Sequence, residues 1–250
     1  MRAIILAAGR GSRLQQTAQR QLPKCLLTFG GRSLLERHLR LLEAAGVEEI
    51  TLALGFRHEL IEAELARLGR PQVEIVLNRQ YELGSMLTVH TAAGPLTRGG
   101  DVLLMDADVL YHEGIMAALT AGRGPVNRLL IDRDFEAGEE PVKVCVRAGV
   151  PIELRKKLEP GLEYDMIGES VGFFRFDERA SRRLAAIVAD HVASSRAHLP
   201  HEEAVRDLLR ERSQSFEVCD VTGMPWIEID FPADVVRATE EVLPQLEVRR

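Results

Sequence analysis

Residues 2–14, RAIILAAGRGSRL, join a strand pattern to a glycine-rich turn. Arg2–Ala7 is an apolar run without polar alternation, which is typical of a buried strand. The turn has glycines at positions 9 and 11, which let backbone N–H groups face a polyphosphate. It is neither a Rossmann G-x-G-x-x-G loop, because Leu14 replaces the third glycine, nor a Walker A loop, because Ser12-Arg13 lacks its Gly-Lys-Ser/Thr. A tight strand-to-loop turn without a ligand is the structural alternative.

Beyond this turn, short apolar runs alternate with segments of helical periodicity. In the first half of the chain we expect strands at residues 2–7, 49–54, 73–77 and 102–105, and helices at residues 33–45, 58–68 and 85–93. Ser33 and Glu36 form a capping box at the start of the first of these helices. Alternation of this kind predicts a parallel sheet with helices on both faces.

The second half of the chain has a different pattern. Val142, Val144 and Val146 alternate with Lys143, Cys145 and Arg147, which predicts an antiparallel strand with one wet face. We expect further strands at residues 150–154, 171–176, 216–219 and 226–231, and helices after Asp177 and at residues 202–209. The expected architecture is a single α/β domain over residues 1–250. It has three layers, is Rossmann-like, and contains a mixed, mainly parallel sheet with antiparallel additions in its second half.

Composition excludes several classes of protein. The chain has 250 residues and a net charge of −6, which argues against a general nucleic-acid or anionic-membrane binder. Its three cysteines are far apart and suggest no disulfide framework, which fits a reducing compartment. The apolar run at the start is too short for a signal peptide or a ~20-residue membrane span. We therefore expect a cytoplasmic protein without a membrane segment.

Positive charge is concentrated near the glycine-rich turn. Residues 1–35 contain six cations and no Asp or Glu. These cations are Arg2, Arg10, Arg13, Arg20, Lys24 and Arg32. A solvated loop is one explanation, but glycines beside Arg13 and Lys24 at one strand end favour a triphosphate site.

Acidic residues stand at the ends of two apolar runs. Asp106 and Asp108 follow residues 102–105 with i, i+2 spacing, so both face the same side of an extended backbone. Trp226, Glu228 and Asp230 share one face of the run at residues 226–231. Turn-forming aspartates and a solvent-facing strand are the alternatives. Because Mg²⁺ takes one or two carboxylates plus substrate oxygens, we expect these acids to bind Mg²⁺.

The two motifs LAAGRGSRL at residues 6–14 and LPKCLL at residues 22–27 together resemble a known signature. It is the LAAGxGxR…PK pattern of the nucleotidyltransferase superfamily that makes nucleoside-diphosphate sugars and alcohols. The resemblance implies the fold of that superfamily and two catalytic residues. Arg13 would contact the nucleoside triphosphate, and Lys24 would contact the phosphates at the reacting centre. The residues expected to bind the nucleotide are Leu6, Ala7, Ala8, Gly9, Arg10, Gly11, Ser12, Ser85 and Asp106. The resemblance implies Gly9 and Gly11, and the backbone of Leu6, Ala7 and Ala8 offers main-chain groups that can read cytosine because their side chains leave it accessible.

The same resemblance implies a metal site. The superfamily has a DxD-like motif at the position of Asp106 and Asp108, with Asp108 the metal ligand and Asp106 nearer the nucleotide sugar. A late carboxylate completes the site, for which Asp230 is the first choice and Glu228 the second. The implied cofactor is Mg²⁺.

Chain length, element spacing and the segment WIEIDFPAD at residues 226–234 look most like the bacterial phosphocholine and 2-aminoethylphosphonate cytidylyltransferases. Asn78 and Tyr81 resemble an N-x-x-Y segment of that group, but Ser85 stands where an asparagine is expected. On the acceptor side the resemblance implies Lys143 and Glu169, with Lys156 and Lys157 nearby. Tyr111 and Trp226 are available as an aromatic wall for an amine-bearing acceptor.

The expected reaction is attack by an acceptor phosphate or phosphonate oxygen on the α-phosphorus of CTP, with release of pyrophosphate. The partners are CTP and a phosphorylated or phosphonate small molecule, with no nucleic acid; a homodimer is left open. One alternative is a sugar-1-phosphate nucleotidyltransferase that uses UTP, GTP or dTTP. The other is a nucleotide-binding regulatory protein without catalysis. The seven histidines have no metal-binding spacing, and we expect His198 and His201 to be surface or core residues.

Overall fold

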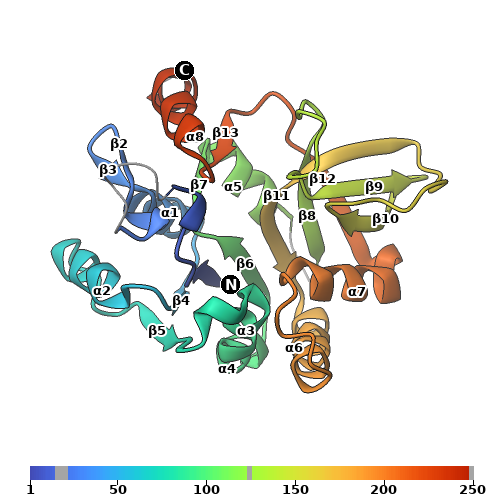
Figure 1. Cartoon of the computed structure of the whole chain (residues 1–250), viewed down its shortest axis with the longest axis horizontal. Helices are drawn as coiled ribbons and strands as arrows, with labels where there is room; N and C mark the ends of the chain where they lie inside the picture. Colours follow the sequence, from blue (N-terminus) through green and yellow to red (C-terminus); the bar gives the residue numbers. More distant parts are fainter. Residues whose placement is uncertain (15–21, 123–125, 248–250) are drawn as a thin grey trace.

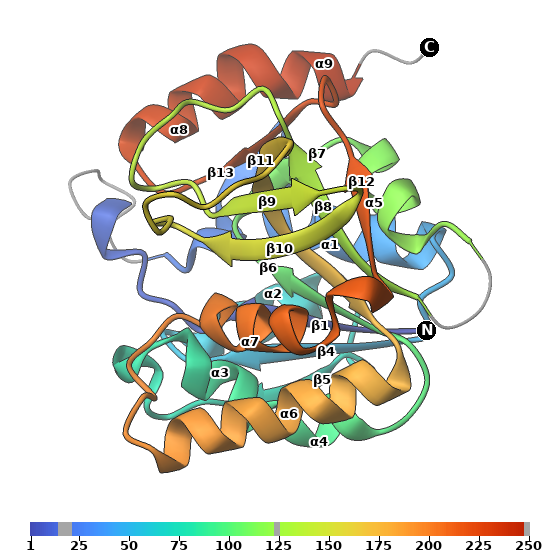
Figure 2. The ribbon, with the colours of Figure 1, turned by 90° about the vertical axis from the view of Figure 1, so that its right-hand side faces the viewer.

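The computed structural model describes residues 1–14, 22–122 and 126–247, and Figures 1 and 2 show its layers. The cation Arg20 lies outside these residues. The strands are β1 (Arg2–Ala7), β2 (Thr28–Phe29), β3 (Arg32–Ser33), β4 (Glu49–Leu54), β5 (Glu74–Leu77), β6 (Val102–Asp106), β7 (Val109–Tyr111), β8 (Asn127–Asp132), β9 (Lys143–Arg147), β10 (Val150–Arg155), β11 (Met166–Phe176), β12 (Phe216–Asp220) and β13 (Trp226–Glu228).

The α-helices are α1 (Leu34–Ala44), α2 (His58–Arg67), α3 (Ser85–Thr91), α4 (Ala93–Thr97), α5 (Glu113–Thr120), α6 (Glu178–Ala193), α7 (Glu202–Arg212), α8 (Pro232–Arg237) and α9 (Leu243–Glu247). Short 3₁₀ turns are η1 (Ser12–Leu14), η2 (Lys24–Leu26), η3 (Tyr81–Leu83) and η4 (Ser213–Ser215), and η5 (Ala238–Val242) is a π-helical turn. None of the helices in the described part of the chain is long and apolar enough to cross a membrane.

One sheet forms the centre of the molecule. The described residues give it nine strands, in the order β10-β9-β11-β6-β1-β4-β5, with β8 beside β11 and β12 beside β8. β1 pairs in parallel with β4 and β6, β4 pairs in parallel with β5, and the strands from β9 to β11 pair antiparallel. The expected mixed sheet with antiparallel additions in the second half is confirmed.

Helices cover both faces of this sheet, as the alternation predicted. One apolar cluster joins α1, α2 and α5 to one face, and a second joins α3, α4, α6 and α7 to the other. A third cluster packs η5 and α9 against β7, β13 and the segment around β2. Figure 2 shows α8 and α9 on the opposite side of the molecule from α3, α4 and α6. The C-terminal helices therefore hold β13 beside β7, next to the carboxyl end of β6.

Local sequence patterns predicted the ends of several strands and helices correctly. β1 has the predicted bounds, and the Ser33 side chain accepts a hydrogen bond from the backbone N of Glu36 at the start of α1. The Glu36 carboxylate pairs instead with Arg40 at 3.0 Å, so the capping box is one-sided. At the start of α6, Asp177 accepts from the backbone N of Ala180. These caps satisfy N–H groups that the first helical turn leaves without partners.

Two expectations about strands need correction. The face of β9 expected to be wet is only partly so, since Arg147 is exposed and Lys143 is half-buried but Cys145 is fully buried. The strand expected at residues 226–231 ends at Glu228. It ends there because the Asp234 carboxylate accepts hydrogen bonds from the backbone N of Asp230 and of Phe231, which turns the chain into α8. Among the described strands and α-helices, those that were not expected are β2, β3, β7, β8, α4, α5, α8 and α9.

Candidate functional site

The predicted acids meet at the carboxyl edge of the sheet. Asp108 follows β6, Glu228 ends β13, and Asp230 comes two residues later. Pairing of β13 with β7 sets Glu228 opposite Val109, and the backbone N of Ile229 donates to the carbonyl of Asp108 at 2.9 Å. One oxygen from each of Asp108, Glu228 and Asp230 lies within 4.8 Å of the others. The sequence motifs thus converge, although residues 108 and 228 are far apart in the chain.

Lys24 lies between two of these acids. Its Nζ donates to Asp108 Oδ2 at 2.7 Å and to Asp230 Oδ1 at 2.6 Å. Burial of the ammonium lowers its pKa, but the charges of Asp108 and Asp230 and the two hydrogen bonds outweigh burial and raise the pKa above the ordinary value. Lys24 is therefore a fixed positive charge at the edge of the sheet.

Arg13 reaches the same acids from the glycine-rich turn. One guanidinium nitrogen lies 3.0 Å from Asp230 Oδ1, and another lies 2.8 Å from Glu140 Oε2. The guanidinium also lies over the ring of Phe231, 5.1 Å from its centroid. The same oxygen of Glu140 is 3.1 Å from Lys156 Nζ, so one carboxylate bridges the turn and the end of β10. The two predicted catalytic cations thus lie beside the predicted metal-binding acids.

The donor set fits a hard divalent cation. Three carboxylates offer oxygen atoms only, which suits Mg²⁺ better than a softer metal. Part of the Glu228 side chain reaches solvent, yet desolvation of its carboxylate, together with the charges of Asp108 and Asp230, raises its pKa to about 9. A cation bound among these acids would reverse the repulsion that causes this shift.

The glycine-rich turn lies beside Lys24. Gly11 has φ +62°, a backbone conformation that favours glycine, and a Cβ there would meet Lys24 Cγ at 3.0 Å. Both the backbone conformation and the lack of space therefore favour glycine at this position. Gly9 has open space where its Cβ would be. Ala7 and Ala8 are buried, Leu6 is half-buried, and Ser12 begins η1. The turn therefore leaves its backbone accessible beside the cations, as a phosphate cradle requires.

Arg10 points away from this cluster. It donates to Glu82 Oε1 at 2.8 Å, and its guanidinium lies 5.7 Å from the centroid of the Phe56 ring. Arg10 therefore faces the side of the turn opposite Arg13, toward η3.

Asp106 and Ser85 lie on the α3 side of the site. Gly172 of β11 has φ +78°, and a Cβ there would lie 2.5 Å from Asp106 Oδ2, so glycine makes room for this carboxylate. The hydroxyl of Ser85 accepts a hydrogen bond from the backbone N of His201 at 2.9 Å. Desolvation raises the pKa of Asp106 to about 7, although His201 opposes the shift. The predicted nucleotide residues thus adjoin a histidine that was expected to have no role.

His201 is the residue that sequence reasoning missed. It is buried at the start of α7, and its Nδ1 lies 3.0 Å from Glu202 Oε2. Burial lowers its pKa, but Glu202 and Asp106 more than compensate and raise it to about 9. The adjacent acid Glu202 was a weak sequence signal for a charged histidine, since opposite charges within about 6 Å favour the ionised form.

Three of the four predicted acceptor residues lie close together. Glu169 of β11 is opposite Lys143 on β9 and Asp132 on β8, and Trp226 Nε1 donates to Asp132 Oδ2 at 2.8 Å. Desolvation and the charge of Asp132 raise the pKa of Glu169 to about 7. Lys143 Nζ donates to three backbone carbonyls, of Gly138 at 2.7 Å, Pro141 at 3.2 Å and Lys156 at 2.7 Å.

The prediction for Tyr111 is wrong. Its side chain is 5% exposed and lies in the core, with its hydroxyl 3.3 Å from His38 Nδ1 and its ring against Phe173. Tyr111 belongs to the apolar core cluster, so its ring offers almost no surface to an acceptor.

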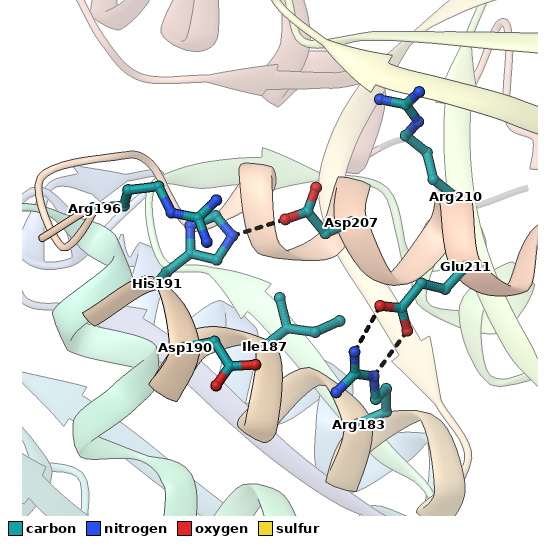
Figure 3. Close-up of a pocket in the computed structure, with 8 residues that line it drawn as sticks. All are labelled: Arg183, Ile187, Asp190, His191, Arg196, Asp207, Arg210 and Glu211. Atoms are coloured by element: carbon teal, nitrogen blue, oxygen red, sulfur yellow. Dashed lines mark hydrogen bonds and ion pairs between the residues drawn. The ribbon is translucent and has the colours of Figure 1, made fainter. Parts of the chain in front are cut away.

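A hollow of about 380 Å³ lies elsewhere, between α6 and α7 (Figure 3). Its charged groups are largely paired with one another, as Arg183 is with Glu211 and His191 with Asp207. It contains none of the predicted site residues.

Comparisons with known proteins show which proteins this chain resembles. The chain is 27% identical over 238 residues to the "Bifunctional IPC transferase and DIPP synthase" of Aquifex aeolicus, covering 94% of this chain and 50% of that protein. It thus spans about half the length of that relative. It is 23% identical over 258 residues to the "CTP:phosphoglutamine cytidylyltransferase" of Campylobacter jejuni, covering 94% of this chain and 98% of that protein.

The fold also matches solved structures. The inositol-1-phosphate CTP transferase from T. maritima superposes with a TM-score of 0.76 at 22% identity, covering 98% of this chain and 94% of that one. The model of the MobA-like NTP transferase domain matches residues 3–215, which is most of the chain. The chain therefore belongs to the MobA-like NTP transferase domain family, within the nucleotidyltransferase superfamily that its two N-terminal motifs resemble.

Proposed function

We propose that this nucleotidyltransferase is a Mg²⁺-dependent cytidylyltransferase that moves CMP from CTP to a phosphate or phosphonate oxygen of a small acceptor, releasing pyrophosphate. The observation that carries the proposal is the convergence of Lys24 and Arg13 with Asp108, Glu228 and Asp230 at one sheet edge. A domain that only bound nucleotides would not need both cations together with all three acids. This combination favours catalysis over a regulatory role.

The chain's own residues position the reacting groups and balance their charge. The backbone of residues 9–11 holds the triphosphate, and Arg13 and Lys24 offset the negative charge that develops on the leaving pyrophosphate. Asp108, Asp230 and Glu228 would hold Mg²⁺, which neutralises charge on the reacting phosphates when it is bound. The acceptor oxygen is the nucleophile, so the reaction needs no serine or cysteine nucleophile.

The choice of CTP and of acceptor class rests on two kinds of support. The relative from C. jejuni and the structure from T. maritima are both named for CTP and for phosphorylated small molecules. In this chain, Glu169 and Asp132 place two carboxylates beside Trp226, a combination that suits an acceptor carrying an amine. A sugar-1-phosphate nucleotidyltransferase using UTP, GTP or dTTP is the second candidate, because a sugar-1-phosphate presents the same attacking phosphate.

A substrate matrix tests the proposal. Four nucleoside triphosphates are each mixed with phosphocholine, 2-aminoethylphosphonate, inositol-1-phosphate and glucose-1-phosphate, with Mg²⁺ or with excess EDTA, and pyrophosphate release is measured. Release with CTP and a phosphate or phosphonate acceptor, only when metal is present, is the expected result. Asp108→Asn serves as the inactive control for contaminating activity. If pyrophosphate is released only from UTP or dTTP, and only with glucose-1-phosphate as acceptor, the chain belongs to the second candidate.

A further inference from the structure

His201 lies behind Asp106, where the start of α7 meets the start of α3. Its backbone N and its ring Nδ1 lie 2.9 Å and 3.2 Å from the hydroxyl of Ser85, and Nδ1 also lies 3.0 Å from Glu202 Oε2. These contacts turn Nδ1 toward Ser85 and Glu202. The other ring nitrogen, Nε2, faces Asp106, whose Oδ1 lies 4.0 Å away.

This Nε2 has no hydrogen-bond partner and is out of contact with solvent. An unpaired buried donor costs about 1–3 kcal/mol, and such groups are rare enough in native proteins to call for an explanation. The surrounding acids favour the imidazolium form of His201, in which Nε2 carries a proton that it can donate. The nearest acid oxygen in that direction belongs to a residue expected to bind the nucleotide.

Asp106 is confined from its other side by Gly172. Because a Cβ at Gly172 would lie 2.5 Å from Asp106 Oδ2, only glycine leaves room for the carboxylate there. A shift of about 1.2 Å would bring Oδ1 within the ~2.8 Å of a charge-assisted hydrogen bond to His201 Nε2. The carboxylate is thus held between a glycine backbone and an unpaired cationic N–H.

We propose that His201 is a positioning residue that orients the Asp106 carboxylate toward the bound nucleotide, and that Ser85 acts through His201 rather than by contacting the base. The inference rests on the proposed function, since it concerns how the same site holds its nucleotide. It also explains why a serine at this position is sufficient: its short side chain reaches the backbone N of His201.

Kinetics of His201→Gln test the proposal. With CTP varied, we expect the KM to rise roughly tenfold, while the KM for the acceptor and the kcat stay within about twofold of wild type. His191→Gln is the matched control, because His191 is equally buried and also faces an acid, Asp207 at 2.8 Å, but lies in the hollow of Figure 3. The control should lower the Tm and leave both KM values unchanged. An unchanged KM for CTP in His201→Gln would overturn the proposal.

A binding cycle separates positioning from simple support of the fold. CTP affinity is measured by calorimetry for wild type, His201→Gln, Asp106→Asn and the double variant. If His201 acts through Asp106, removing it in the Asp106→Asn background should change the Kd by less than twofold. Additive losses would overturn the proposal.

Variants of Ser85 test the same proposal if the His201→Gln protein does not fold. Ser85→Ala should weaken CTP binding by about threefold, and Ser85→Thr, which keeps the hydroxyl, should restore it. Loss in both Ser85 variants would contradict a role through His201. A wild-type protein that binds no CTP would refute the proposed function itself, which is a different outcome.

Discussion

Replacing Lys24 by methionine removes the charge that joins two acids while keeping much of the side chain's volume. The ammonium makes two charge-assisted hydrogen bonds, at 2.7 Å and 2.6 Å, each worth about 1.5–3 kcal/mol. The Lys24, Asp108 and Asp230 side chains are 15%, 19% and 14% exposed, so water still reaches the group and screens the charges. We therefore use the lower value for each bond, which gives a total of about 3 kcal/mol. In a chain of this size that predicts a fall in Tm of roughly 6–12 °C in EDTA.

Activity should fall as well. Lys24 is expected to offset charge on the leaving pyrophosphate, and losing one preorganised donor costs about 10²–10³ in rate in other enzymes. We expect kcat/KM for CTP to fall by that factor. Pyrophosphate release with saturating acceptor measures it, and circular dichroism follows the unfolding.

Arg98→Met is the matched control, since Arg98 also bridges two carboxylates, Glu49 at 3.1 Å and Glu74 at 2.8 Å, but on the surface. It should leave kcat/KM within about twofold of wild type. A Lys24→Met protein with kcat/KM within about threefold of wild type would refute the role given to the ammonium. Added Mg²⁺ should raise the Tm of Lys24→Met more than that of wild type, because the acids have then lost their internal cation.

Four further predictions follow from the site. Asp108→Asn and Asp230→Asn should each abolish turnover with little change in the circular dichroism spectrum, and full activity of the wild type in excess EDTA would contradict the metal assignment. Arg13→Ala should lower kcat/KM by at least tenfold, measured by pyrophosphate release. CTP should be preferred to UTP by at least tenfold in kcat/KM with a common acceptor; equal values would contradict the choice of base. The raised pKa of Glu169 predicts that its contribution to stability is present below about pH 4.5 and is lost as the pH rises through about 7. Glu169→Gln should therefore be more stable relative to wild type at pH 8 than at pH 5, and a constant difference in unfolding free energy would argue against this.

The sequence predicted the parts of the site that depend on local pattern. An apolar run that ends in acids identified Asp108, which follows β6, a strand parallel to β1 whose carboxyl end lies at the edge where ligands bind. Asp230 was expected from the shared face of residues 226–231 and from the family resemblance, and the antiparallel pairing of β13 with β7 brings it to the same place. Residues whose position depends on distant contacts were not predictable in this way. His201 meets Ser85 across 116 positions, and no spacing rule connects them. Tyr111 lies on a strand of three residues, too short for alternation to reveal which side is buried.

The hydrogen bond from Lys24 to Asp230 joins residues 206 positions apart, and its wider meaning concerns how the chain folds. Asp108 and Asp230 would repel each other if the fold brought them together without a cation. The lysine supplies that cation from within the chain, so Asp108 and Asp230 have a positively charged partner in the fold without a metal ion. Under the proposed function, a bound triphosphate would compete with these acids for the same ammonium. One side chain would then both join distant parts of the chain and take part in the proposed reaction.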